Sequence, residues 1–313
     1  MTGVQTCALP IFNLNPTDPG LKRILLLMLP ATIGMSATQI NIFVNTNFAA
    51  SCAQGSVSWL NYAFRLVQLP IGVFGVALSI AVMPVLARQA AEKDLVSLKQ
   101  TFTSSLVLVF ALAVPATAGL MLLSQPIIRL IFEHGAFTAA DTLQTAAALT
   151  FYAYGLFAYS AIKVMVPVFY AIGNTKYPVI GSFLGVAANV LIIYQVVDLF
   201  QHRGIALATS CAMILNFLFL SVVLYRKLAG YPVGYLLRGL AKILTAAGLM
   251  SGGIWGMQQL LAPWTHGSTL LQGAFLAALI GVGVGIYATS LQLLRLPEFT
   301  LLTGKVAQRF RRS

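Results

Sequence analysis

The chain has 313 residues, of which 58% are apolar and only 8% are charged, and its formal net charge is +12. An average soluble domain is about 25% charged, so this composition excludes a soluble globule, and the high apolar content excludes a disordered chain. The sequence lacks the short alternating segments that build a transmembrane barrel, which leaves a polytopic, all-α membrane protein. The basic excess then indicates loops that face anionic lipid, and no nucleic-acid partner is expected.

Residues 1–11 have no basic segment followed by an apolar run, so they do not form a signal peptide. They resemble translated adapter sequence, and we expect them to be a non-native leader. Beyond them, uncharged apolar stretches are long enough to cross a bilayer. These stretches predict eight transmembrane helices, at about residues 21–50, 57–87, 97–124, 142–171, 176–199, 204–227, 239–261 and 269–294. A short segment, Pro126–Phe137, is predicted to be a surface helix outside the membrane.

The basic residues are distributed unevenly between the two sides of the predicted bundle. An even number of spans places both ends of the chain on one side, and most of the 19 Lys and Arg residues fall there. Only Arg129 and Arg203 fall on the other side. Because cytoplasmic loops are rich in Lys and Arg, we expect both ends to be cytoplasmic, including a basic tail at 297–313. The two remaining basic residues, Arg65 and Lys163, lie inside predicted spans.

A charge at the bilayer centre costs about 2.5–3.5 kcal/mol on insertion scales, so such residues usually face a water-filled cavity or a partner. The second span carries a polar face at alternating spacings of three and four residues: Ser58, Asn61, Arg65, Gln68, Gly72, Gly75 and Ser79. The first span repeats the pattern with Gly34, Thr38, Asn41 and Asn45, and the fifth offers Asn189. We therefore predict a hydrated cavity that binds an anionic ligand, with these contact residues: Arg65, Lys163, Asn61, Gln68, Asn41 and Asn45.

Other interpretations of the same residues stay open. Small residues at these spacings also allow close helix packing, as do the GxxxG pairs Gly181–Gly185, Gly252–Gly256 and Gly281–Gly285. The Asn and Gln side chains could serve only as hydrogen bonds between helices. Arg65 and Lys163 could instead extend to the nearest membrane surface. Prolines within the spans, Pro70 among them, predict kinks.

The sequence gives no sign of enzyme chemistry. It contains no GxSxG, no HExxH and no P-loop, so no catalytic activity and no cofactor are expected. Its three cysteines and three histidines are scattered, which argues against a metal site.

Four short motifs are more specific than the composition. They are GSVSWLNYAFRLVQLPIGVFGVAL at 55–78, FEHGAFT at 132–138, FYA at 169–171 with NTK at 174–176, and GIALATS at 204–210. Together they resemble the MurJ/MviN family of lipid II flippases, and the resemblance covers about residues 18–300. That family belongs to the superfamily of multidrug, oligosaccharidyl-lipid and polysaccharide exporters.

The resemblance implies about fourteen helices, with two six-helix lobes facing a cationic cavity. Residues 12–230 would then form the second six-helix lobe, and 231–296 would form two helices that make a groove for a lipid tail. The first lobe, the N-terminal lobe of the same protein, would be missing, and the chain would be a truncated gene product. Arg65 matches the family's cavity arginine and Lys163 a basic position. Some relatives have acids where this chain has Phe64 and Gln68, which puts any charge-pair or proton role there in doubt.

The function implied is movement of lipid II, the undecaprenyl-pyrophosphate-linked peptidoglycan precursor, from the inner to the outer leaflet by alternating access. The expected location is the bacterial inner membrane, and the expected partners are lipid II and the surrounding membrane lipids. Two alternatives stay open. The chain could export another lipid-linked oligosaccharide or a drug, or it could be a non-transporting scaffold for cell-wall enzymes. A net-positive cavity argues against cationic drugs.

Overall fold

The computed structural model describes residues 19–261 and 269–299. The leader predicted at 1–11 and most of the tail predicted at 297–313 lie outside the described residues. Within those ranges the chain consists of helices and turns, with no β-strand. In chain order the helices are α1 (Pro19–Ala50), α2 (Ser56–Pro70), the π-helix η1 (Ile71–Val76), α3 (Ala77–Ala91), α4 (Leu95–Leu122), α5 (Ser124–Phe132), α6 (Ala139–Ala153), α7 (Leu156–Ala171), α8 (Lys176–Phe200), α9 (His202–Lys227), α10 (Val233–Leu261) and α11 (Thr269–Leu293).

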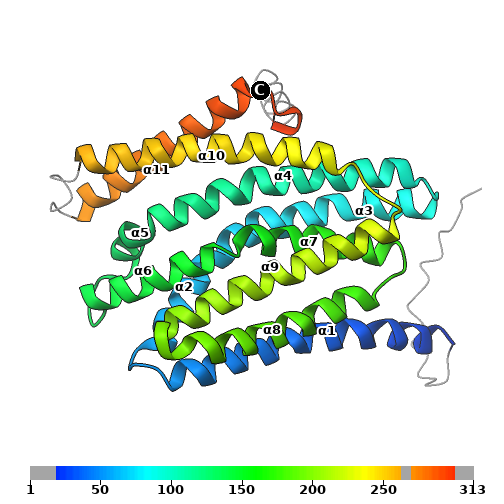
Figure 1. Cartoon of the computed structure of the whole chain (residues 1–313), viewed down its shortest axis with the longest axis horizontal. Helices are drawn as coiled ribbons and strands as arrows, with labels where there is room; N and C mark the ends of the chain where they lie inside the picture. The colour runs from blue at the N-terminus through cyan, green and yellow to red at the C-terminus, as the bar shows by residue number, and fades with distance from the viewer. Residues whose placement is uncertain (1–18, 262–268, 300–313) are drawn as a thin grey trace, which may run out of the picture.

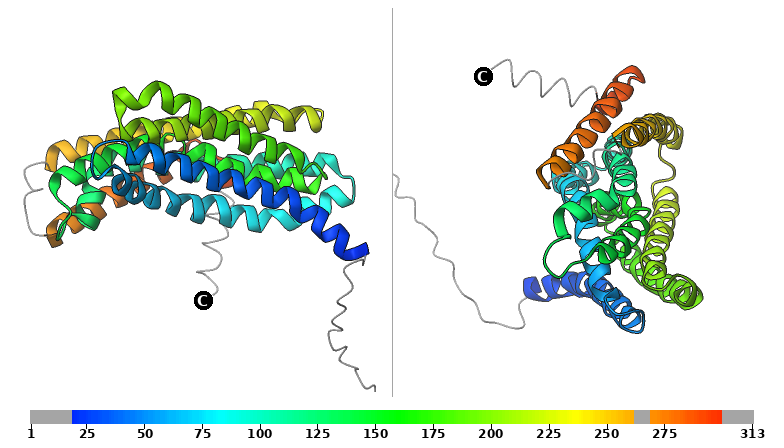
Figure 2. Two further views of the ribbon diagram at one scale, coloured as in Figure 1. Left: turned by 90° about the horizontal axis from the view of Figure 1, so that it is seen from below. Right: turned by 90° about the vertical axis from the view of Figure 1, so that its left-hand side faces the viewer.

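The long helices run side by side along the longest axis of the molecule (Figure 1). Helix α8 packs along α9 and α1, while α10 packs along α11 and α4. In the end-on view, α1 and α11 lie at opposite edges of the bundle (Figure 2, right). One buried cluster, which includes Phe102, Phe169 and Ile243, joins α4, α7 and α10. A second, which includes Leu60 and Leu149, joins α2 and α6.

The structure supports a multi-pass membrane protein. Six helices are long and apolar enough to cross a membrane, and the bent pair α6–α7 makes a possible seventh. Each of the seven overlaps a predicted span, because runs of this length without charge are helical where water is absent. The remaining predicted span, 21–50, coincides with α1, which is not among the seven. The count of eight therefore stays a prediction, as does the domain division at residue 230, which falls between α9 and α10.

Two of the helices are capped at their N-termini by side chains of nearby residues. Asp94 accepts a hydrogen bond from the Ser97 backbone N–H at 3.0 Å, which caps the start of α4. This bonding to Ser97 lowers the pKa of the exposed Asp94 carboxyl from its ordinary value. At the start of α6, Thr138 and Asp141 form a reciprocal capping box. The short helix predicted within 126–137 is α5, which begins two residues earlier and ends at Phe132.

Glycines set the closest helix contacts, but not all those that the GxxxG pattern predicts. Gly181 on α8 lies against Asn216 of α9, so a side chain at 181 would collide with that amide. The prediction for the other two pairs is wrong: Gly252, Gly256, Gly281 and Gly285 have no described atom within 4 Å of where a Cβ would lie. In α10 and α11 the contact is made instead by Gly253, against Ile286, and Gly283, against Ile254. Spacing alone does not decide which helix face meets a neighbour.

A polar cavity as the candidate binding site

A cavity of about 360 Å³ lies between α1, α2, η1, α6, α7 and α9. Its volume is within the range of ordinary small-molecule sites, which is about 300–1,000 Å³. Five of the six predicted contact residues line it: Asn41, Asn45, Asn61, Gln68 and Lys163. The rest of its wall is formed by Thr38, Ile42, Thr46, Ala49, Val57, Leu60, Phe64, Ile71, Gly72, Val76, Tyr152, Tyr159 and Thr209. The polar faces of separate spans thus meet at a common space.

Lys163 is the one charged residue among those that line the cavity in the described part of the chain. It is exposed on α7, and its Nζ lies 5.7 Å from the centroid of the Tyr159 ring, one turn earlier. Within residues 19–261 and 269–299 no acidic side chain forms an ion pair with it. A cation held over an aromatic face and left without a counter-ion suits an anionic ligand.

Arg65 is placed differently. It lies on α2 between Asn61 and Gln68 and is exposed, but it is not among the residues that line the cavity. In the described chain its guanidinium forms no ion pair. The alternation of three and four residues put Arg65 on the same face as its neighbours, and it lies at the edge of that face. Its role in binding stays a prediction.

A π-helical turn changes the polar face of the second span. Pro70 has no backbone N–H, and the six residues after it form η1, where the Ala77 N–H donates to the Gly72 carbonyl five residues back. The span continues through this turn to Ala91. Because the π-turn contains one more residue than an α-helical turn, each later position on the polar face is taken by the next residue in the sequence. Val76 therefore lines the cavity in place of Gly75, which the spacing predicted on the polar face.

Gly75 contacts α7 instead. A Cβ at this position would lie 3.2 Å from the Ser160 Cα and 3.5 Å from the Lys163 Cβ. The missing side chain lets the π-turn approach α7 closely at the residue that carries the cavity's charge. Gly72, three residues earlier, has open space around it and lines the cavity.

The amides of α1 belong to a buried network beside the cavity. The Asn189 Nδ2, on α8, donates to the Oδ1 atoms of Asn41 and Asn45, both at 2.7 Å. The Asn45 Nδ2 donates to the Thr209 Oγ1 at 3.1 Å. Asn189 is completely buried. Asn41 and Asn45 therefore line the cavity and also join helices, so the hydrogen-bonding interpretation describes part of what they do.

Replacing Asn189 with Ala is expected to lower the free energy of unfolding by about 1–3 kcal/mol, because it removes the donor to the half-buried amide oxygens of Asn41 and Asn45. The measurement is thermal unfolding of the purified chain in detergent. Asn47→Ala is the matched control, since the exposed Asn47 donates only to Phe43 of its own helix. Equal midpoints for the two variants would contradict a stabilising network.

The fourth predicted span is broken, which the sequence did not predict. Helices α6 and α7 meet at 44° around Tyr154 and Gly155. The Gly155 N–H donates to the Tyr152 carbonyl at 3.1 Å, so the Phe151 carbonyl loses its usual helical partner. The Ser210 hydroxyl, on α9, donates to that Phe151 carbonyl at 2.7 Å. A neighbouring helix thus supplies the hydrogen bond that the Phe151 carbonyl loses at the break. Helix α9 lies so close that a Cβ on Gly155 would be 2.8 Å from the Ser210 Cα.

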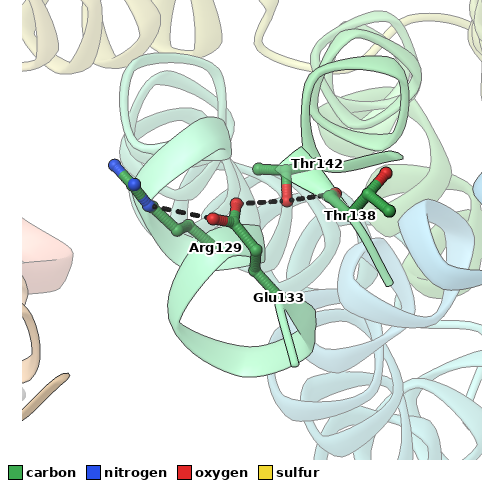
Figure 3. A network of polar contacts seen from close by, with 4 residues as sticks. All are labelled: Arg129, Glu133, Thr138 and Thr142. Carbon is green, nitrogen blue, oxygen red and sulfur yellow. Dashed lines mark hydrogen bonds and ion pairs between the residues drawn. The ribbon is translucent and has the colours of Figure 1, made fainter. Parts of the chain in front are cut away.

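A second polar network closes the connection between α5 and α6 (Figure 3). Arg129 pairs with Glu133 at 3.3 Å, and the Thr142 hydroxyl donates to the other Glu133 oxygen at 2.6 Å. The Trp59 indole N–H donates to Asp141 at 2.8 Å, which ties α2 to the start of α6. These contacts give a structural role to Glu133 and Thr138 of the 132–138 motif and to Trp59 of the 55–78 motif.

No group of three or more His, Cys, Asp or Glu residues that could hold a metal ion occurs in the described ranges. Sequence reasoning missed Tyr152, Tyr159 and Thr209 in the cavity wall. A pattern of polar residues does not include aromatic side chains, and Tyr152 and Tyr159 lie on either side of the break, so they share no continuous helix face.

Comparisons with known proteins agree with this architecture. Residues 3–275 match the family model described as lipid II flippase MurJ. The chain is 32% identical to a probable lipid II flippase MurJ of Vibrio cholerae over 281 residues, covering 88% of this chain and 53% of that protein. It is 36% identical over 273 residues to a probable lipid II flippase MurJ of Rhizobium tropici, covering 86% of this chain and 51% of that protein. The chain thus spans about half the length of these curated relatives.

Comparison with solved structures agrees with the family match. A lipid II flippase MurJ in an inward closed conformation superposes with a TM-score of 0.72 at 28% identity, covering 87% of this chain and 55% of that one. An outward-facing multidrug resistance MATE transporter of the MOP superfamily superposes at 0.59 with 18% identity, covering 87% and 63%, a likeness of fold alone. The matching proteins are flippases and transporters, which confirms the prediction that the chain is not an enzyme.

Proposed function

The chain belongs to the lipid II flippase MurJ family, and from this premise we propose that its cavity binds the pyrophosphate-linked headgroup of lipid II. The observation that carries the proposal is the Lys163 ammonium in the cavity wall, which forms no ion pair with any described residue and lies beside a set of amides and hydroxyls. A pyrophosphate supplies the missing negative charge, and a sugar-peptide headgroup uses the polar wall.

The proposed mechanism is alternating access in the bacterial inner membrane. Lipid II enters from the inner leaflet, and its pyrophosphate contacts Lys163 together with Arg65. The remaining half of a full-length family member supplies the facing wall, since this chain spans about half of its relatives. Rocking of the two halves then exposes the headgroup to the outer leaflet. Both ends of the chain lie on the cytoplasmic side in this arrangement.

The polyprenyl tail is proposed to lie along α10 and α11. No Asp, Glu, Lys or Arg occurs between Lys242 and Arg295. Several large apolar side chains on these helices are exposed in the structure, among them Leu249, Trp255 and Val284. An uncharged, exposed surface of this kind suits contact with an isoprenoid chain within the hydrocarbon layer.

Binding to the purified chain in lipid nanodiscs tests the proposal. We expect undecaprenyl pyrophosphate to bind, and a hydrophobic drug cation such as ethidium not to bind, because Lys163 repels cations. Binding of the cation without the pyrophosphate lipid would favour a drug exporter. Binding of neither would favour a scaffold and remove the proposed function.

Replacing Arg65 with Ala is expected to weaken undecaprenyl pyrophosphate binding, because a phosphate contact to a charged group contributes about 1.5–3 kcal/mol. Arg88→Ala is the control, since Arg88 is an exposed residue of α3 that pairs with Glu92 at 3.9 Å. Affinity equal to that of the control would show that Arg65 has no part in the site.

A further inference from the structure

Two tyrosines line the cavity on opposite arms of the broken span. Tyr152 is in the last turn of α6, and Tyr159 is in the first turn of α7, with Gly155 between them. Tyr152 is only 6% exposed. The cavity wall thus extends from the last turn of α6 to the first turn of α7.

Neither phenol makes a hydrogen bond within residues 19–261 and 269–299. Two other tyrosine hydroxyls of this chain do: Tyr287 donates to the Ala111 carbonyl, and Tyr235 donates to Glu298, both at 2.6 Å. An enclosed phenol without a partner is costly, but neither of these hydroxyls is fully enclosed, so both are open to a partner in the cavity. The two unpaired phenols are on the cavity wall, and there a ligand can supply their partners.

The surroundings of the phenols favour a particular kind of ligand group. The Tyr152 ring lies 5.4 Å from that of Phe64, centroid to centroid, and the two form an aromatic wall. The Tyr159 ring lies beneath the Lys163 ammonium. Flat aromatic faces with free hydroxyls at their edges match a sugar, which has C–H groups on its faces and hydroxyls around its rim. The unpaired ammonium beside them matches the phosphate to which that sugar is joined.

Contacts from α9 stabilise the break between α6 and α7. The Ser210 hydroxyl donates to the Phe151 carbonyl, which has lost its helical partner, and it also lies 3.2 Å from the Tyr152 carbonyl. A small void beside the break is lined by Gly155, Ser210, Tyr152 and Tyr159. The 44° bend changes the direction of the span between the two tyrosines.

We propose that Tyr152 and Tyr159 contact the sugar portion of the headgroup and hydrogen-bond to its hydroxyls, while Lys163 contacts the phosphate. This inference rests on the proposed function, because it assigns the sugar and the phosphate of one ligand to neighbouring parts of one cavity. It makes the two tyrosines determinants of headgroup specificity.

The test compares two lipids on the full chain in nanodiscs: lipid II with its disaccharide-peptide, and undecaprenyl pyrophosphate, which has no sugar. Tyr152→Phe and Tyr159→Phe keep the rings and remove only the hydroxyls. We expect each to weaken lipid II binding by about three- to tenfold, as the loss of one neutral hydrogen bond predicts, with undecaprenyl pyrophosphate binding unchanged. Tyr154→Phe is the matched control, since Tyr154 is at the same break, is 45% exposed and does not line the cavity.

The outcomes separate this inference from the proposed function. If both cavity variants bind lipid II as the Tyr154 control does, the sugar assignment is overturned, while pyrophosphate binding still supports the proposed function. If the cavity variants weaken both lipids equally, the tyrosines do not distinguish the sugar and the assignment is again overturned. If the unmodified chain binds neither lipid, the proposed function fails and the inference fails with it.

Discussion

Replacing Lys163 with Met is expected to weaken undecaprenyl pyrophosphate binding by about ten- to a hundredfold. Hydrogen bonds to charged groups contribute about 1.5–3 kcal/mol, and 1.4 kcal/mol corresponds to a factor of ten in affinity. Methionine keeps the length and packing of the side chain but removes the positive charge. The measurement is a binding isotherm for the lipid with the purified chain in nanodiscs, and the loss should exceed that of any single uncharged cavity variant.

The chain provides a close control for this experiment. Lys227, near the end of α9, lies 5.2 Å from the centroid of the Tyr177 ring, so it repeats the cation-over-aromatic arrangement away from the cavity. Lys227→Met should leave binding unchanged. Unchanged binding in the Lys163 variant, or an equal loss in both, would show that the cavity charge does not hold the ligand.

Replacing Gly155 with Ala is expected to lower the stability of the chain, because there is no room for a methyl group at this position. The new Cβ would lie 2.8 Å from the Ser210 Cα, a backbone atom that no side-chain rotation can move away. Overpacking of this kind typically costs about 1–3 kcal/mol. Helices α7 and α9 must then separate, so we also expect lower affinity for undecaprenyl pyrophosphate, because Lys163 is on α7. Thermal unfolding in detergent measures the first effect, and the nanodisc isotherm measures the second.

Gly248→Ala on α10 is the matched control for Gly155→Ala. A Cβ there meets no described atom within 4 Å, and alanine is the better helix former by about 1 kcal/mol. This variant should unfold at the same temperature as the original chain or higher. If Gly155→Ala does the same, α9 is not packed against the break as the structure has it.

The helices were predictable because charge is expensive in a bilayer. The bounds of α8, for example, differ from the predicted 176–199 by a single residue. The break in the fourth span was not predictable in the same way. The run around Gly155 is as apolar as its surroundings, and the hydroxyl that satisfies the freed carbonyl belongs to Ser210, which is distant in sequence. A break of this kind depends on tertiary contacts that spacing does not encode.

The candidate site was predicted in part for a similar reason. Polar residues at helical spacing identified Asn61 and Gln68, because their alternative is contact with lipid. Arg65 has the same spacing but lies outside the cavity wall, because the polar face of α2 is wider than the part of it that lines the cavity. Tyr159 was missed because aromatic residues are common on lipid-facing and core surfaces alike. Whether these residues bind a ligand stays a prediction.

The π-turn at Ile71–Val76 gives the second span one residue more than a continuous α-helix of the same rise would contain. Each residue of an α-helix turns the chain by about 100°, and the wider turn spreads one more residue over nearly the same rotation, so α3 keeps the direction that a continuous helix would give it. Deleting one residue between Pro70 and Ala77 would therefore allow an unbroken α-helix through this point, with Arg88 and the rest of the far end still facing the same way. Adding one residue to an ordinary transmembrane helix turns its far half by about 100°, whereas this span holds its additional residue within a single turn.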